Sequence, residues 1–355
     1  MKKRLQSKVK ISLAFVTIVL LLALAGCGSQ TPQNSGNTPD TNDKAQQETK
    51  DKAQEKTAQE TIRVPYYTPK AGGTAYVAGA TIAEAVSKYA PNIKMNAEAT
   101  NGSVPSVKLT GEKAEIGEPT IAQILSSNAA QALNGEKPFE KKYDLRGVVF
   151  NYGSELNLIV PKNSPIKSVA DIKGKKISMN ASGSGVSLLS MQMVKAHGVD
   201  EKDFSPVWLG SNEIVAAIKD GSIDGGFIGA SIPVPAIVEL ASQKDIRLVS
   251  LDEQVVDNVV ADSPFYYKGL IPGGTYKGVE EDAITIGYGV VCVTSAKTSD
   301  DIIYNMLKAI FEHKPELEAA SPILKQMTLE DATKSITIPL HPGAEKYYKE
   351  KGVLK

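Results

Sequence analysis

Ser182-Gly183-Ser184-Gly185 separates a segment at 176–180, which we predict to be a strand, from a helical pattern at 186–197. Glycine and serine at such a turn let the backbone bend sharply, and the helix that follows begins with unpaired N–H groups. A second loop of this kind, Gly72-Gly73-Thr74, opens a helical pattern at 74–90. Two strand-to-helix loops about 110 residues apart predict two similar α/β lobes.

The rest of the folded part alternates short β-rich runs with helical stretches. We expect further helices at 104–111, 169–172 and 214–220. We expect strands at 93–97, 114–117, 145–150, 156–160, 176–180, 224–228 and 246–251. This alternation predicts an α/β chain with mostly parallel sheets.

The N-terminus carries the pattern of an export signal. Basic residues at 1–10 precede an apolar run at 11–25, and small residues lead to Cys27. The order resembles the lipobox of bacterial lipoproteins, so we predict a signal peptide at 1–27 with Cys27 as the lipidated residue. A membrane-spanning anchor is the alternative, but the apolar run is about 15 residues and a span needs about 20.

Composition bounds the remaining chain. Residues 28–61 contain no large apolar side chain, which predicts a disordered tether between the lipid and the folded part. The 40 basic and 40 acidic residues balance, which argues against a nucleic-acid partner. The second cysteine, Cys292, lies in an apolar run and is expected to be a small buried side chain. With Cys27 lipidated, no internal disulfide is expected.

Motifs for catalysis are missing from the sequence. It contains neither the phosphate-binding P-loop pattern nor the G-x-S-x-G nucleophile motif, and Leu188 stands where a dinucleotide fingerprint after 183–185 needs glycine. One of the three histidines, His341, lies four residues before Glu345. We interpret that spacing as a local helix contact in preference to a metal pair. We expect a binding protein with no enzymatic activity, no cofactor and no metal.

Several segments, in order, resemble the TAXI solute receptors, the extracytoplasmic binding proteins of tripartite ATP-independent (TRAP) transporters. They are the loops at 72–74 and 182–185 and the segments 101–103, 168–175, 220–225 and 338–348. The last, Ile338-Pro339-Leu340-His341-Pro342-Gly343-Ala344-Glu345-Lys346-Tyr347-Tyr348, is the most specific. The resemblance runs from about Tyr66 to the C-terminus.

The resemblance implies a two-lobed α/β periplasmic-binding-protein fold of the second topological type, with the ligand in a cleft between hinged lobes. It places the first part of lobe 1 at 62–158, lobe 2 at 159–262, and the return crossover with the rest of lobe 1 and the C-terminal helices at 263–355. It implies a receptor that captures a small amino acid or organic acid, such as glutamate. Together with the lipobox at Cys27, we expect an exported, membrane-anchored monomer. The partner would be an ion-driven TRAP permease.

Carried over by position, the resemblance implies a set of cleft residues in both lobes. They are Gly73, Thr74, Tyr76, Asn101, Ser103, Ser182, Ser184, Gly185, Val186, Gly229, Pro233 and Pro235. The sequence departs from the family pattern at Ser106, at Val186 and at 118–120, where Glu118 becomes a further candidate.

The matched cleft motifs carry no Lys or Arg, so a bound carboxylate is expected to rest on hydroxyls and helix N–H groups. Glu118 would favour an ammonium group, and we therefore expect a zwitterionic amino acid in preference to a dicarboxylate. Two other functions remain open. A sensory lipoprotein would have the same fold, whereas an exported enzyme would need a catalytic set in the cleft.

Overall fold

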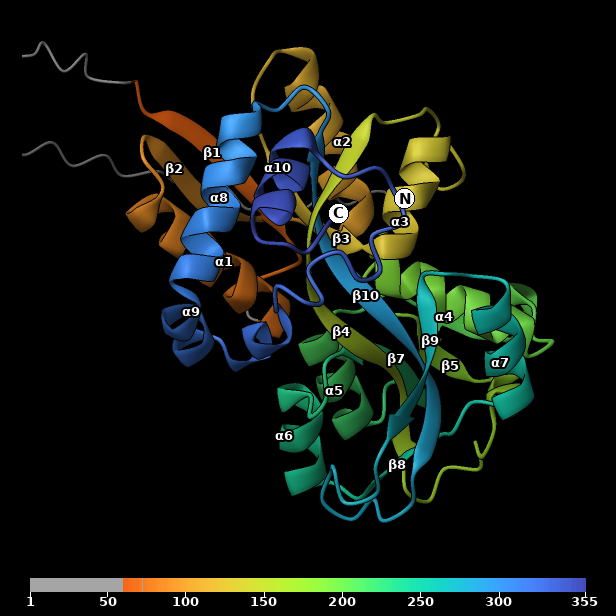
Figure 1. Ribbon diagram of the computed structural model, residues 1–355. Helices are drawn as coiled ribbons and strands as arrows, with labels where there is room; N and C mark the ends of the chain where they lie inside the picture. Colours follow the sequence, from red (N-terminus) through yellow and green to blue (C-terminus); the bar gives the residue numbers. More distant parts are fainter. Residues whose placement is uncertain (1–59, 72) are drawn as a thin grey trace, which may run out of the picture. The chain divides into compact units, whose positions relative to one another are not determined.

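The computed structural model describes residues 60–71 and 73–355 of the 355-residue chain (Figure 1). The predicted signal peptide, Cys27 and nearly all of the predicted tether lie outside the described residues. Within the described part, none of the helices combines the length and the apolar character needed to cross a membrane.

Strands and helices alternate along most of the described chain. The strands are β1 Ile62–Thr68, β2 Ile93–Ala99, β3 Ile121–Leu125, β4 Leu145–Pro161, β5 Lys176–Ser178, β6 Ser205–Val207, β7 Gly225–Ala230, β8 Ile246–Leu248, β9 Tyr266–Ile271 and β10 Ala283–Ser295. The α-helices are α1 Thr74–Tyr89, α2 Ser103–Glu115, α3 Ser126–Asn134, α4 Gly185–Ala196, α5 Ser211–Asp220, α6 Pro235–Gln243, α7 Glu253–Ala261, α8 Asp300–Glu312, α9 Lys314–Ala320 and α10 Pro342–Glu350. Short 3-10 turns are η1 Val169–Ile172, η2 Glu201–Asp203 and η3 Pro322–Gln326.

One mixed sheet organises both lobes. Its order is β2-β1-β3-β10-β4-β7-β5-β6, with β8 added to β4 and β9 added to β10. Strands β1, β2 and β3 pair in parallel, as do β5, β6 and β7, whereas β10 and β4 are antiparallel to their neighbours. We call the half with β1–β3, α1–α3 and α8–α10 lobe 1, and the half with β5–β9 and α4–α7 lobe 2.

The two longest strands, β4 and β10, run from one lobe into the other (Figure 1). The C-terminal part of β10 pairs with β3 in lobe 1, and its N-terminal part pairs with β9 in lobe 2. The two strands pair with each other from Gly287↔Glu155 to Ser295↔Leu145. They are therefore both the crossovers between the lobes and the middle of the sheet.

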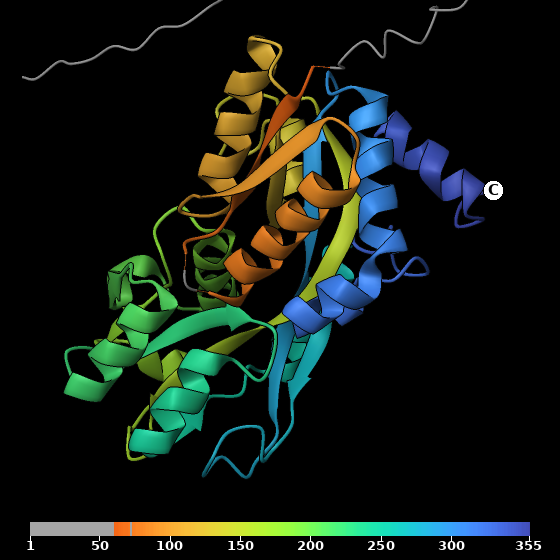
Figure 2. The same ribbon diagram turned by 90° about the vertical axis from the view of Figure 1, so that its left-hand side faces the viewer.

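Helices cover both faces of the sheet, because apolar side chains project from both faces and must be buried. In lobe 1, α8 packs against α1 and α10, while α2 and α3 lie together beside β3 (Figure 2). One apolar core continues through both lobes by way of Tyr152, Leu156 and Tyr288 on the crossover strands. Two smaller cores lie under α5 and α6 in lobe 2 and under α2 and α3 in lobe 1.

Three predictions about elements are wrong. The segment 114–117 is the end of α2 and not a strand, because Gly117 adopts a left-handed conformation (φ +78°) that ends the helix. The strands expected at 145–150 and 156–160 form the single strand β4. The sheet is mixed, because its two central strands are shared between the lobes and run against their neighbours.

Candidate functional site

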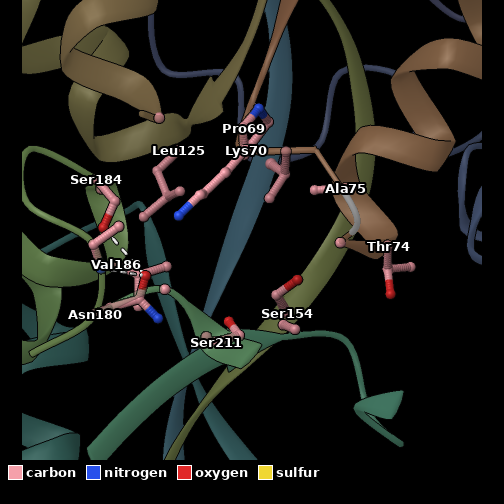
Figure 3. Close-up of a pocket in the computed structure, with 18 of the residues that line it drawn as sticks. Pro69, Lys70, Thr74, Ala75, Leu125, Ser154, Asn180, Ser184, Val186 and Ser211 are labelled. Atoms are coloured by element: carbon pink, nitrogen blue, oxygen red, sulfur yellow. Dashed lines mark hydrogen bonds between the residues drawn. The ribbon is translucent and has the colours of Figure 1, made fainter. Parts of the chain in front are cut away.

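A cavity of about 420 Å³ lies between the lobes (Figure 3). It opens at the carboxyl ends of the parallel strands of both lobes, where α/β proteins commonly bind ligands. Lobe 1 contributes Pro69 and Lys70 after β1, and lobe 2 contributes Asn180 after β5 and Gly229 in β7. The volume falls in the range of small-molecule sites.

Six helices begin at the cavity wall. The residue that precedes the first turn of each of α1 to α6 lines it, and these residues are Gly73, Gly102, Leu125, Ser184, Gly210 and Val234. Among these residues only Ser184 caps its helix with its own side chain, because its hydroxyl accepts a hydrogen bond from Ser187 N–H at 3.0 Å. Helix N-termini present N–H donors and partial positive charge, so the wall suits an anionic group or another acceptor.

The loop before α4 is held by Asn180, whose backbone is left-handed (φ +75°). Its amide nitrogen donates to the Phe227 carbonyl at 3.2 Å and its amide oxygen accepts from Ala181 N–H at 2.8 Å. Asparagine tolerates this conformation because its short polar side chain bonds to the local backbone. The loop held by Asn180 therefore places Ser184 and the start of α4 at the cavity.

The lobes touch beside the cavity, where α4 begins. A Cβ atom added to Gly185 would lie 2.4 Å from Asn128 Oδ1, 2.8 Å from Ser103 Oγ and 2.9 Å from a Leu125 methyl carbon, all in lobe 1. Ser103 and Leu125 also bond to each other, since the Ser103 hydroxyl accepts from Leu125 N–H at 3.2 Å. Glycine at 185 is thus what permits this approach of the two lobes.

Two charged side chains, Lys70 and Glu213, occur among the described residues that line the cavity. They form an ion pair between the lobes, with Nζ and Oε1 3.0 Å apart. Figure 3 shows Lys70 reaching from the end of β1 toward lobe 2. Glu213 also accepts from Gly210 N–H at 2.6 Å. That backbone bond, and then Lys70, holds the pKa of Glu213 below its usual value.

The floor of the cavity comes from the crossover strands. Tyr152 and Ser154 on β4 and Tyr288 and Val290 on β10 all line it, because alternate residues of a strand share a face. The pairs Val290↔Tyr152 and Tyr288↔Ser154 are direct neighbours in the ladder. Burial raises the pKa of both tyrosines, so both phenols stay protonated at neutral pH.

The structure brings most of the sequence-predicted residues to this cavity. Those that line it are Gly73, Thr74, Asn101, Ser103, Ser184, Gly185, Val186, Gly229 and Pro235. Tyr76, Ser182 and Pro233 do not. Ser182 and Pro233 are exposed outside it, and Tyr76 is half-buried in the first turn of α1.

The structure places Glu118 outside the lining of this cavity. It follows the C-terminus of α2, whereas the N-terminus of α2 lines the wall, and it pairs with Lys113 at 2.5 Å. The expected preference for an ammonium group therefore loses its basis. A cation at the wall, Lys70, was not expected from the sequence, because that residue lies outside the matched motifs.

Among the described residues, the remaining titratable side chains do not gather into a metal-binding cluster. Groups of three or more His, Cys, Asp or Glu side chains placed to hold a metal do not occur in 60–71 or 73–355. His341 is buried, and both of its ring nitrogens are hydrogen-bonded. The Glu345 carboxylate lies near Lys349, so it does not share a metal ion with His341. Cys292 is buried and contacts Tyr66 and Asn151, and burial raises the pKa of its thiol to about 12.

The fold is the two-lobed α/β fold of periplasmic binding proteins. The chain belongs to the NMT1-like family, whose profile matches residues 67–352.

Individual relatives are distant. The chain is 34% identical over 67 residues to a protein of Escherichia coli (strain K12) named for aliphatic sulfonate binding, and this match spans 19% of this chain and 21% of that protein. Among solved structures it is similar to MatC from Rhodopseudomonas palustris with bound malate (TM-score 0.51, 16% identity, 84% of this chain and 99% of that one). It is also similar to the periplasmic aliphatic sulphonate binding protein SsuA from Escherichia coli (TM-score 0.43, 17% identity, 82% and 83%).

Proposed function

We propose that this protein is an extracytoplasmic receptor that binds a small organic acid or amino acid between its lobes. The observation that carries the proposal is the cavity wall built from the N-termini of six helices drawn from both lobes. A ligand held by donors from both sides stabilises the closed arrangement of the lobes, which is how a two-lobed receptor signals that it is loaded.

The ligand chemistry follows from the charges at the wall. Lys70 and Glu213 compensate each other, so the site offers no unpaired cation among the described side chains that line it. A carboxylate would therefore rest on helix N–H groups, on the Ser184 region and on the phenols of the floor. Apolar side chains such as Leu125, Val186 and Val290 would cover the carbon skeleton.

The finer parts of the proposal concern partner and location. The resemblance to TAXI receptors supports a TRAP-type, ion-driven permease as the protein that receives the ligand. We also propose that Cys27 anchors the chain to the outer face of a membrane and that residues 28–61 are its tether. We also propose the division into 62–158 of lobe 1, 159–262 of lobe 2, and 263–355 as the return crossover, which includes β9 beside lobe 2, with the rest of lobe 1 and the C-terminal helices. Exchanging Cys27 for Ala should move the exported protein from the membrane fraction to the soluble fraction.

The ligand proposal is tested by titration calorimetry with L-glutamate, L-glutamine, succinate and 2-oxoglutarate. We expect saturable binding of at least one of them. Binding should also change the fluorescence of Trp208, the single tryptophan, which lies just before Gly210 at the cavity. Preference for succinate would identify a dicarboxylate site, and preference for glutamate or glutamine an amino acid site. Absence of binding, together with no small acid co-purified on mass spectrometry, would contradict the proposal.

A further inference from the structure

A buried polar cluster lies beneath the cavity floor. It consists of Tyr66, Gln123, Asn151, Tyr152 and Cys292, all at most 3% exposed. Gln123 and Tyr152 also line the cavity, whereas the other three do not. Buried polar groups of this kind are normally fully paired, so the direction of each hydrogen bond can be worked out from donors and acceptors.

The orientation of the Gln123 amide is fixed by the backbone. Its Nε2 lies 3.1 Å from the carbonyl oxygen of Ala75, which can only accept a hydrogen bond, so the nitrogen must be on that side. Its Oε1 then faces two donors, Tyr66 Oη at 3.3 Å and Asn151 Nδ2 at 3.2 Å. The same assignment leaves Asn151 Oδ1 to accept from the Cys292 thiol at 3.1 Å.

The orientation of Gln123 decides the role of Tyr152. Nε2 of Gln123 lies 2.9 Å from the Tyr152 hydroxyl, and an amide nitrogen donates but does not accept. The phenol oxygen of Tyr152 is therefore the acceptor in this contact, and its own proton is left over. In the part of the chain that the structure describes, no group is placed to accept that proton, and the side chain borders the cavity.

We infer that Tyr152 is a ligand-specifying residue, a hydrogen-bond donor set by Gln123 and aimed at the cavity, which selects ligands that place an acceptor oxygen at the floor. This inference rests on the proposed solute-binding function and sharpens it. A carboxylate or carbonyl oxygen satisfies the donor, whereas an ammonium or methyl group at the same place leaves the phenol proton without a partner.

The test compares Tyr152→Phe with Tyr66→Phe by calorimetry, using whichever of L-glutamate, L-glutamine, succinate and 2-oxoglutarate binds the wild-type protein most tightly. Tyr66→Phe is the matched control. It removes a tyrosine hydroxyl from the same cluster, at a residue that does not line the cavity. We expect Tyr152→Phe to raise Kd by about 10- to 100-fold, as for a lost bond to a charged acceptor. Tyr66→Phe should lower the thermal midpoint and change Kd by less than about 3-fold.

The possible outcomes distinguish a failure of this inference from a failure of the proposed receptor function. If the wild-type protein binds a probe and Tyr152→Phe binds it equally well, or if both variants lose affinity alike, Tyr152 has no selective role. If the wild-type protein binds none of the probes and no small acid co-purifies with it, the receptor proposal fails and this inference fails with it. A crystal structure of the wild-type complex is a check that needs no variant. A ligand oxygen about 2.6–3.0 Å from Tyr152 Oη is expected, and a carbon or nitrogen there would overturn the inference.

Discussion

His341 shows how a single residue in the C-terminal block acts through hydrogen bonds alone. Its Nε2 lies 2.9 Å from the Thr298 carbonyl oxygen and therefore carries the proton, while Nδ1 accepts from Gly343 N–H at 3.2 Å and caps α10. This arrangement needs the neutral imidazole. Burial, the largest influence, lowers the pKa of His341, and the Arg146 charge lowers it further. The Thr298 carbonyl and Asp300 act in the opposite direction.

Stability should therefore depend on pH through His341. The folded state holds its pKa below the 6.5 of a free histidine, so the unfolded chain binds more protons between the two values. The contribution is complete above about pH 6.5 and is lost as the pH falls from there through the lower pKa of the folded state. We expect the free energy of unfolding in urea to drop between pH 7 and pH 5.

His341→Asn should flatten that drop, because Asn can cap α10 but does not titrate. At pH 7 it should cost about 1–3 kcal/mol through the lost bond to Thr298. Glu345→Gln is the control, since Glu345 lies four residues away and is near Lys349. It should leave the pH dependence as it is. An equal slope for wild type and His341→Asn would exclude His341 as the cause.

Among the elements, α4 decides how near the lobes can come. Its first residue, Gly185, has an ordinary φ, so alanine there meets no backbone strain. The added Cβ would instead meet three lobe 1 atoms within 2.9 Å. The same substitution at Gly73, which precedes α1 at the same cavity, has only the Lys70 carbonyl oxygen nearby, at 3.9 Å. The two glycines thus form a matched pair.

Gly185→Ala should therefore impair closure and not folding. We expect its thermal midpoint to stay near that of the wild type, while ligand affinity falls about 10-fold or more because closure becomes costlier by at least ~1.4 kcal/mol. X-ray scattering should show less ligand-induced compaction than in wild type, whereas Gly73→Ala should compact normally. Wild-type compaction in Gly185→Ala would refute the steric argument.

Elements with local signals could be predicted from the sequence. The two Gly/Ser loops located α1 and α4 within a few residues, because turn chemistry and apolar spacing are properties of neighbouring residues. The sharing of β4 and β10 between lobes could not be predicted, since strand partners lie far apart in the chain. Lys70 and Glu118 show the same limit at the site. Which of them borders the cavity depends on the direction of α2 and on where β1 ends. Neither can be predicted from a local sequence motif.

At the scale of the whole described molecule, the ion pair of Lys70 and Glu213 joins the lobes at the cavity. Both side chains are more than half exposed, at 61% and 54%. Exposed pairs contribute about 0–1 kcal/mol and are screened by salt. The pair therefore stabilises the closed arrangement only weakly. The equilibrium between open and closed lobes then depends mainly on the ligand.

Lys70→Gln should raise ligand Kd by less than about 5-fold, with the difference from wild type shrinking in 1 M salt. Lys113→Gln is the control, because its partner Glu118 belongs to the same lobe and no closure depends on that pair. It should not change Kd. A loss above about 100-fold for Lys70→Gln would instead mean that Lys70 binds the ligand directly.

The position of β10 has a consequence for how the chain can be shortened. This strand comes late in the sequence, yet it lies between β3 and β4 in the centre of the sheet. A nascent or clipped chain that ends before Ala283 would lack the middle of the sheet, with β3 and β4 both left as open edges that can pair with other chains. Loss of residues 283–355 should therefore yield chains that aggregate and are degraded by proteases, and not a smaller functional receptor.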